Sequence, residues 1–220
     1  AGPGGVAIVQ DAIDAKKYVF NPDTRAAVRE SLSLRDSFVI GHVGRFAEVK
    51  NHGFLLDVFS EVAGKRPNAR LVLVGDGTLR GAMADKAEQL GLSGRVAFLG
   101  VRDDVPSLMQ AFDALVLPSH YEGLPGVTTE AQAAGLPCLI SDRVTRECDI
   151  VPNLCTFLPI GQGTAPWVDA ITGLESAAHD MVRRNTCAEI AAAGFDSGRQ
   201  AQNYAKMYLE KENGSTWTAF

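Results

Sequence analysis

A glycine-led loop in the first half of the sequence contains two cations that could bind an anionic ligand. Gly44-Arg45 is followed by Lys50, and a helical pattern begins shortly afterwards at Phe54. Backbone N–H groups at a helix N-terminus attract anions, and nearby cations strengthen that attraction. The loop therefore predicts a site for a phosphate or another anion that uses Arg45 and Lys50. The alternative is a solvated loop that carries two surface charges.

Two glutamates in the second half could bind the hydroxyl groups of a ligand. Glu122 lies in a loop rich in glycine and proline, and Glu130 lies eight residues later in the next helical pattern. A wholly helical segment of that length would place them about 12 Å apart, and a loop shortens this distance. The spacing is too wide for paired carboxylates at one bond, but it suits two points of an extended ligand. The alternative is that Glu130 stabilises a helix N-terminus and Glu122 is solvated.

Two further glycine turns could approach a ligand through their backbone. Gly75-Asp76-Gly77 follows one predicted strand as a tight turn, and Gly100-Val101 follows the next. Exposed backbone groups at Gly100 and Val101 could form hydrogen bonds with a flat base. Each signal is weak alone, and a plain turn is the simpler interpretation of the first.

Several common catalytic patterns are absent from the sequence. It has no G-x-x-x-x-G-K-[ST] phosphate loop, no G-x-G-x-x-G dinucleotide motif and no D-x-D pair that could hold a divalent metal against a diphosphate. The four histidines are dispersed, and His120, beside the glutamate loop, is interpreted as packed or solvated. The charge of a bound phosphate would therefore be met by Arg45, Lys50 and helix dipoles.

The elements that must position these residues alternate along the middle of the chain. Short apolar runs predict strands that are covered on both faces, and longer amphipathic patterns between them predict helices. The alternation predicts an α/β fold with a doubly wound, parallel, six-stranded Rossmann-like sheet. Ligands bind such sheets at the carboxyl ends of the strands, where the loops described above lie. The predicted strands span residues 38–43, 70–74, 96–99, 114–117, 138–140 and 156–158, and the helices between them span 54–65, 79–90, 105–111 and 127–134.

The flanks differ from this alternating core. Residues 1–37 contain a short apolar piece at 6–9 and a predicted helix at 24–33. Residues 160–220 contain only helical patterns, at about 167–184, 186–193 and 197–210, the last with Asp196 as its expected N-cap. Chain length agrees with such additions, because 220 residues correspond to about one and a half domains.

Composition excludes several classes of function. The net charge of −5 argues against a nucleic-acid partner, which usually requires a basic face. No apolar run is long enough to span a membrane. The four cysteines form no C-x-x-C pair, so we expect reduced structural thiols and a cytoplasmic location. The chain starts without Met on a glycine-rich stretch, and we expect a cut end or a tag scar there.

Taken together, these segments resemble the C-terminal, donor-binding half of family 4 retaining glycosyltransferases, which have the GT-B fold. The most similar members are bacterial exopolysaccharide or capsule transferases, and the resemblance covers roughly residues 8–212. Two departures are Gln10-Asp11-Ala12, where the family's linker has Pro-Asn-Gly, and Thr128-Thr129, where small apolar residues are more common. The matching segments, in order, are Val43-Gly44-Arg45 with Lys50-Asn51, Leu73-Val74-Gly75-Asp76-Gly77, Phe98-Leu99-Gly100, Glu122-Gly123-Leu124-Pro125 with Glu130-Ala131, Ala134-Gly135-Leu136-Pro137, and Ser141-Asp142.

The resemblance implies a role for each matching residue. Arg45 and Lys50 would hold the diphosphate of a nucleotide sugar, which we expect to be UDP-linked, and stabilise the leaving group. Glu122 would contact hydroxyls of the donor sugar, and Glu130 would bind the ribose. The catalytic residues would thus be Arg45, Lys50 and Glu122, and the substrate-binding residues Gly44, Gly75, Gly100, Val101, Gly123, Leu124 and Glu130.

The resemblance also implies an organisation and partners. Residues 1–37 would be a linker from an absent N-terminal domain, 38–159 the nucleotide-sugar-binding core, and 160–220 helices that pack on the core and on that absent domain. The acceptor would be a glycan or a lipid-linked saccharide, bound through the absent domain, with peripheral membrane association of the full enzyme. No cofactor or metal is expected, and the fragment alone would transfer sugar poorly. One alternative is a nucleotide-sugar epimerase of the same fold. Another is a non-catalytic nucleotide-binding module, and this one would be favoured if Arg45, Lys50 and Glu130 did not meet in one cleft.

Overall fold

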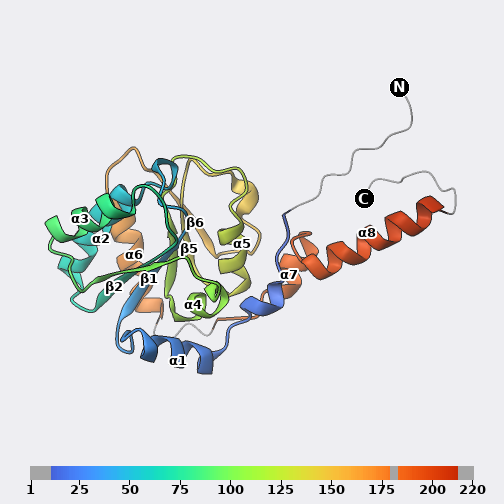
Figure 1. Cartoon of the computed structure of the whole chain (residues 1–220), viewed down its shortest axis with the longest axis horizontal. Helices are drawn as coiled ribbons and strands as arrows, with labels where there is room; N and C mark the ends of the chain where they lie inside the picture. Colours follow the sequence, from blue (N-terminus) through green and yellow to red (C-terminus); the bar gives the residue numbers. More distant parts are fainter. Residues whose placement is uncertain (1–10, 179–182, 213–220) are drawn as a thin grey trace.

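The computed structural model describes residues 11–178 and 183–212, and a parallel β-sheet forms its centre (Figure 1). Six strands pair in the order β3-β2-β1-β4-β5-β6, all parallel. The middle strands are buried on both faces because they are continuous apolar runs. The fold prediction is confirmed, and the strands are β1 (Phe38–Val43), β2 (Ala69–Val74), β3 (Val96–Gly100), β4 (Ala114–Leu117), β5 (Cys138–Ser141) and β6 (Cys155–Leu158).

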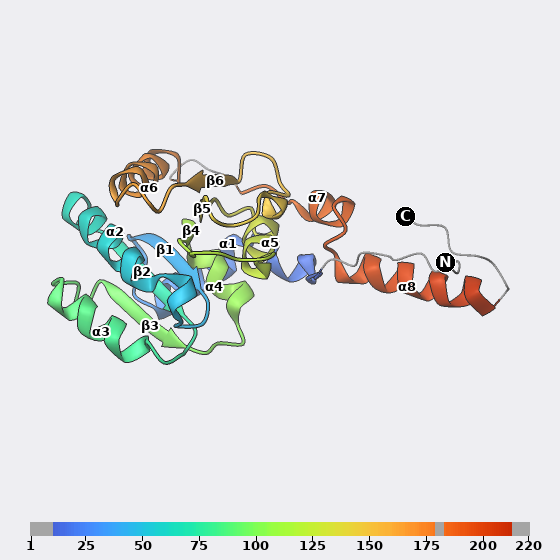
Figure 2. The same ribbon diagram turned by 90° about the horizontal axis from the view of Figure 1, so that it is seen from above.

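Helices cover both faces of this sheet, as a view from above shows (Figure 2). Helices α2 (His52–Lys65), α3 (Arg80–Gln89) and α6 (Ala165–Ala178) lie on one face, and α1 (Pro22–Ser31), α4 (Val105–Ala111) and α5 (Gly126–Ala133) lie on the other. Each face has its own apolar cluster, one around Phe59 and Trp167 and one around Phe112 and Leu136. Helix α2, which begins two residues before its predicted start, buries Leu55, Val58, Phe59 and Val62.

The segment before β1 is fastened firmly to the core. Asp113, at the start of β4, accepts hydrogen bonds from Arg25 (2.5 Å) and Arg29 (3.2 Å) of α1 and from the backbone N–H of Val39 (2.7 Å). The Arg29 guanidinium is buried and also donates to the carbonyl of Ala111 at 2.8 Å. Helix α1 therefore lies along α4, and it begins two residues before the predicted position because Asn21 caps it.

The described residues after β6 include three helices, as the sequence predicted. Helix α6 packs against α2, and α7 (Cys187–Ala192) contacts α5 and the 3-10 turn η1 (Ala15–Tyr18). Asp196 accepts the N–H of Arg199 at 2.8 Å, as expected of an N-cap, and α8 (Ser197–Glu212) then extends away from the sheet (Figure 1). The predicted helix 167–184 does not reach its predicted end, since residues 183–186 are not helical, and residues 179–182 and the apolar piece at 6–9 lie outside the described residues. No helix in the described ranges is long and apolar enough to cross a bilayer.

Candidate functional site

The best candidate site lies where the strand order of the sheet reverses. From β1 the chain first builds outward through β2 and β3, then returns to β4 on the other side of β1. Ligands of open α/β sheets bind in the crevice outside the carboxyl ends of the strands at such a point. Lys50 follows β1 and Glu122 follows β4, so the two residues stand on either side of the reversal.

Lys50 and Glu122 form a direct ion pair. The Lys50 ammonium lies 2.6 Å from Oε1 of Glu122, and their side chains are only 18% and 16% exposed. The hydroxyl of Ser119 donates to the same oxygen at 2.7 Å. Because both contacts engage Oε1, the other carboxylate oxygen is left to accept a hydrogen bond from a ligand hydroxyl.

Two hydrogen bonds hold the loops after β1 and β4 together. The N–H of His120 donates to the carbonyl of Val49 at 2.8 Å, and the side-chain amide of Asn51 donates to the carbonyl of Pro118 at 3.2 Å. Asn51 has a left-handed backbone, with φ of 55°, which joins the 3-10 turn η2 (Glu48–Lys50) to helix α2. The turn therefore presents Lys50 toward β4 at a fixed position. The side chain of His120 is exposed, in line with its interpretation as solvated.

Arg45 lies on the same loop but has a different environment. Its side chain is exposed and forms no ion pair or hydrogen bond within the described part of the chain. The loop itself is held to the next one, since the N–H of Phe46 donates to the carbonyl of Asp76 at 3.0 Å. Arg45 is thus a free cation on a fastened loop, at the same edge of the sheet as Lys50.

The absence of a side chain at Gly75 allows the loop after β2 to pack closely against the loop after β1. A Cβ atom on Gly75 would lie 2.1 Å from the carbonyl oxygen of Gly44, and its φ is +130°. The N–H of Gly75 donates to the carbonyl of Gly100 at 2.8 Å, so that carbonyl is already engaged. Val101 beyond it is 76% exposed. The loops after β1, β2 and β3 therefore form one connected backbone surface on which Val101 is open to a ligand.

Glu130 lies in α5 and contacts the segment that precedes the core. It forms a hydrogen bond with Tyr18 of η1. Burial raises the pKa of Glu130, the Tyr18 bond opposes this rise, and the nearby charge of Asp11 adds to it. Burial and the Glu130 carboxylate together raise the pKa of the Tyr18 phenol. Glu130 lies beyond the first turn of α5, so the alternative that it stabilises the N-terminus of this helix is wrong.

The loop before α5 holds the remaining predicted residues. Glu122 forms an isolated bridge with Val144, Gly123 is exposed, and Leu124 packs partly against the core. Thr128 and Thr129, which depart from the family pattern, are both buried. The Thr128 hydroxyl donates to the carbonyl of Pro125 at 2.7 Å, a bond that a small apolar residue could not form.

Sequence reasoning set aside two histidines that the structure places behind Lys50. His42 in β1 and His52 in α2 are buried, and their rings meet edge to face with centroids 4.6 Å apart. Burial lowers the pKa of His42 to about 4 and that of His52 to about 3. The signal in the sequence was a polar residue inside an otherwise apolar strand, Phe38–Val43.

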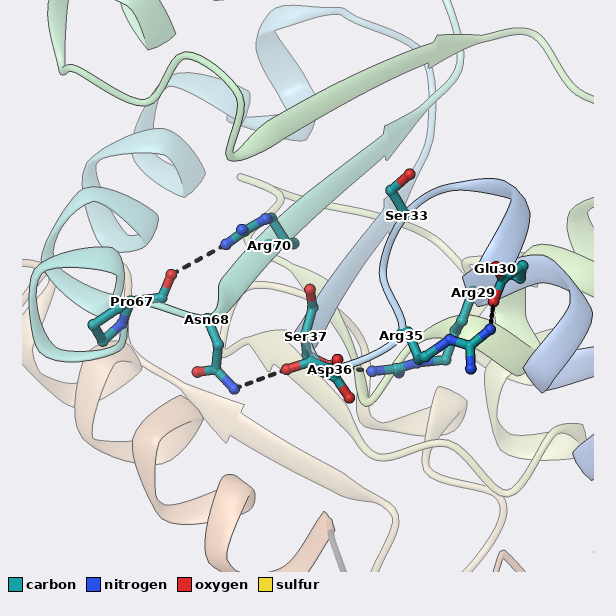
Figure 3. A pocket seen from close by; sticks show the side chains of 9 residues that line it. All are labelled: Arg29, Glu30, Ser33, Arg35, Asp36, Ser37, Pro67, Asn68 and Arg70. Atoms are coloured by element: carbon teal, nitrogen blue, oxygen red, sulfur yellow. Dashed lines mark hydrogen bonds and ion pairs between the residues drawn. The ribbon is translucent and has the colours of Figure 1, made fainter.

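A polar pocket of about 510 Å³ lies at the opposite edge of the sheet, before β1 and β2 (Figure 3). Four of its charged side chains, those of Arg29, Glu30, Arg35 and Arg70, are engaged within the protein. Arg35 pairs with Glu30, Arg70 donates to the carbonyl of Pro67 at 3.1 Å, and Arg29 belongs to the Asp113 cluster. This edge carries the amino ends of the strands, so the pocket does not belong to the predicted site. No group of three His, Cys, Asp or Glu that could hold a metal occurs among the residues with described positions.

Comparison with known proteins identifies the family. The family described as "Glycosyl transferases group 1" matches residues 23–161. The chain is 37% identical over 207 residues to the putative glycosyltransferase EpsF of Bacillus subtilis, covering 92% of this chain and 53% of EpsF. It is 25% identical over 212 residues to the UDP-Gal:alpha-D-GlcNAc-diphosphoundecaprenol alpha-1,3-galactosyltransferase of Escherichia coli, covering 94% of this chain and 55% of that protein.

A solved structure agrees with the fold. HepE of Anabaena in complex with UDP superimposes with a TM-score of 0.77 at 24% identity, over 92% of this chain and 57% of HepE. The chain thus spans about half the length of the curated relatives it matches. The family resemblance that the motifs predicted is confirmed, and this chain belongs to the group 1 glycosyl transferases.

Proposed function

We propose that this chain is the part of a glycosyltransferase that binds the nucleotide-sugar donor, and that the donor is UDP-linked. The observation that carries this proposal is the Lys50–Glu122 ion pair at the strand reversal. It joins a cation suited to a diphosphate and a carboxylate suited to sugar hydroxyls in the crevice where α/β sheets bind ligands. The UDP bound to HepE and the UDP-galactose in the name of the E. coli relative support the choice of nucleotide.

In this proposal, each part of the donor meets a different group of the site. Lys50 and Arg45 bind the diphosphate and stabilise its charge as the bond to the sugar breaks, which is the usual largest contribution to such catalysis. Glu122 accepts from sugar hydroxyls through its unengaged oxygen. Glu130 binds the ribose, which requires it to exchange or share its bond with Tyr18. Val101 and the backbone beside it contact the base.

In this scheme Lys50 and Arg45 neutralise the charge of the leaving diphosphate, so we propose that sugar transfer needs no metal. The acceptor, a glycan or a lipid-linked saccharide, would bind to a further domain of a longer protein, for which the length of the relatives leaves room. Retention of the anomeric configuration, a cytoplasmic location and peripheral membrane contact belong to the same proposal.

The boundaries of the parts remain predictions. We propose that residues 38–159 form the donor-binding core and that residues 160–220 also pack on the further domain. Residues 1–37 would connect the two domains. Helix α1 is nevertheless fixed to the core, because its Arg25 and Arg29 pair with Asp113. Any flexible part of the linker would therefore lie before this helix in the sequence.

The non-catalytic alternative would be favoured by separation of Arg45, Lys50 and Glu130. Arg45 occupies the same loop as Lys50, whereas the partner of Glu130 is Tyr18, so this alternative stays a prediction that donor binding and sugar transfer must decide. An epimerase of the same fold makes a different prediction, since it would convert a free UDP-sugar in the absence of an acceptor. Analysis of the products formed from UDP-glucose by this chain separates these two enzymes.

Calorimetric titration of the chain with UDP, UDP-glucose, UDP-galactose and GDP-mannose tests the proposal. We expect UDP and at least one UDP-sugar to bind, and GDP-mannose to bind more weakly. Lys50→Met should abolish most of the UDP affinity, and Lys65→Met provides a matched control, because Lys65 is an exposed lysine of α2 with a distant partner, Asp169, at 3.9 Å. Absence of binding by all four ligands would overturn the proposal.

A further inference from the structure

The ring nitrogen Nε2 of His42 is buried behind the Lys50–Glu122 ion pair, and no hydrogen-bond donor among the described residues reaches it. Nδ1 of His42 lies 2.8 Å from the carbonyl oxygen of Val116, so Nδ1 carries the proton in the neutral ring. Nε2 must then be an acceptor, and it finds no hydrogen-bond partner among the residues that the structure describes. A buried polar group without a partner costs about 1–3 kcal/mol, so such an acceptor calls for an explanation.

The position of this lone pair relates it to Lys50. A Cβ atom on Gly44 would lie 3.2 Å from Nε2 of His42 and 3.4 Å from Cε of Lys50. The His42 nitrogen and the end of the Lys50 side chain thus border the same space beside Gly44. The charge of Lys50 acts on the His42 ring at this distance, since it adds to the lowering of the His42 pKa that burial causes.

The surroundings keep His42 neutral and fixed. His52 meets its ring edge to face, and the His52 ring stacks on Phe46 with centroids 4.1 Å apart. The bond to Val116 of β4 sets the tautomer and ties the ring to the strand that leads to Glu122. An acceptor held in this way can receive an N–H without losing a proton of its own.

We propose that His42 is a positioning residue for Lys50. When a diphosphate draws the Lys50 ammonium away from Glu122, Nε2 of His42 accepts one of its N–H groups and holds the cation beside the phosphate oxygens. The three N–H groups of an ammonium allow it to serve the phosphate and His42 together. Glu122 is then released toward the sugar. This inference rests on the proposed role of Lys50 in binding the donor.

Two substitutions separate positioning from a merely structural role. His42→Asn keeps a donor near Nδ1 for the Val116 carbonyl and removes the acceptor at Nε2. His42→Gln places an amide near Nε2 and gives up the bond to Val116. We expect His42→Asn to weaken UDP binding about tenfold, as the loss of a charge-assisted bond predicts, and His42→Gln to restore most of the affinity. A greater loss in His42→Gln than in His42→Asn would overturn the inference.

A double-mutant cycle shows whether His42 acts through Lys50. In the Lys50→Met background, His42→Asn should change the UDP dissociation constant less than twofold. An equal loss in both backgrounds would mean that His42 only supports the fold, and would overturn the inference.

Nitrogen NMR of the histidine rings provides a test that does not depend on UDP. Inorganic pyrophosphate should shift the Nε2 resonance of His42 toward that of a hydrogen-bonded acceptor in the unmodified chain and leave it unchanged in Lys50→Met. No shift in the unmodified chain contradicts the inference. A shift with pyrophosphate but no binding of UDP would leave the inference standing and overturn the proposed function, so the two failures are distinguishable.

Discussion

The Lys50 ammonium and the Glu122 carboxylate, 2.6 Å apart, neutralise each other across the boundary between β1 and β4. The residues stand 72 positions apart in the sequence and meet because their strands are neighbours in the sheet. In the proposed function, a donor would compete with this ion pair, its phosphate for Lys50 and its sugar for Glu122. The pair therefore links recognition of the two halves of the donor.

This link predicts different effects for the two partners. Lys50→Met should lower the affinity for UDP and for UDP-sugars alike, by tenfold or more, because the phosphate loses a cation. Glu122→Gln should lower the affinity for the accepted UDP-sugar more than that for UDP, since the carboxylate faces the sugar. Calorimetric titration of both variants measures this, with Glu30→Gln at the opposite edge of the sheet as the control. Equal losses for UDP and UDP-sugar in Glu122→Gln would contradict the assignment.

Glu130 offers a prediction about ribose recognition. A carboxylate that accepts from ribose hydroxyls distinguishes UDP from its 2′-deoxy counterpart, and Glu130→Ala should remove that distinction while lowering UDP affinity by about tenfold. Removal of the phenol in Tyr18→Phe leaves the carboxylate in place and should keep the preference for ribose. Competition titrations with UDP and 2′-deoxy-UDP compare the variants. If Glu130→Ala still prefers UDP by the original factor, Glu130 does not bind the ribose.

The loop contact at Gly75 predicts opposite effects for two glycine substitutions. Gly75→Ala must displace the Gly44 backbone, because its Cβ would lie 2.1 Å from that carbonyl oxygen and φ is +130°. We expect a loss of about 1–3 kcal/mol of stability together with weaker UDP binding. Gly64 in α2 has open space where a Cβ would lie, so Gly64→Ala should raise stability by up to about 1 kcal/mol. Urea unfolding of both variants provides the measurement, and equal stability of the two would refute the contact.

The sequence predicted the elements better than the contacts between them. All six strands lie within one residue of their predicted ends, because a strand buried on both faces is a continuous apolar run that turn residues bound on either side. The end of α6 was harder to place, because helical patterns in the flanks have no such sharp boundary. The order of the strands around the reversal came from the structure, because the alternation of strands and helices predicts a doubly wound sheet without giving the order of its strands.

Side-chain partners depended on long-range geometry that no local pattern contains. The sequence placed Lys50 and two glutamates at one edge of a sheet, but it could not decide that Glu122 would pair with Lys50 and Glu130 with Tyr18. The sequence did not single out His42 for the same reason, since only the structure places its ring beside Gly44 and Lys50. The family resemblance implied roles for the loops, and the three-dimensional structure supplied the partners of their side chains.

The Asp113 cluster predicts a large loss of stability from one conservative change. Asp113→Asn would leave the buried Arg29 guanidinium without its counter-charge and weaken the bond to Val39, so we expect a loss of about 3–5 kcal/mol. Asp104 pairs with Arg102 at an exposed position, and Asp104→Asn should have little effect. Urea unfolding at pH 7 compares the two. A small effect of Asp113→Asn would show that α1 is held mainly by its apolar contacts.

The buried histidines predict how stability depends on pH. Their pKa values are lowered, to about 4 for His42 and about 3 for His52, whereas an unfolded histidine titrates near 6.5. Between these values the unfolded chain binds protons that the folded chain excludes, so the stability contribution is constant above pH 7 and is lost as pH falls from about 6.5 toward 4. Each histidine adds a slope of about 1.4 kcal/mol per pH unit in the lower part of that window.

Removal of one buried histidine should therefore reduce this slope. The free energy of unfolding of His52→Phe, measured in urea between pH 7 and pH 4.5, should fall less steeply than that of the unmodified chain. His120→Gln, at an exposed position, serves as the control and should keep the original slope. If His52→Phe and the unmodified chain lose stability in parallel, the pKa of His52 is the same in the folded and the unfolded chain, and its burial does not exclude a proton.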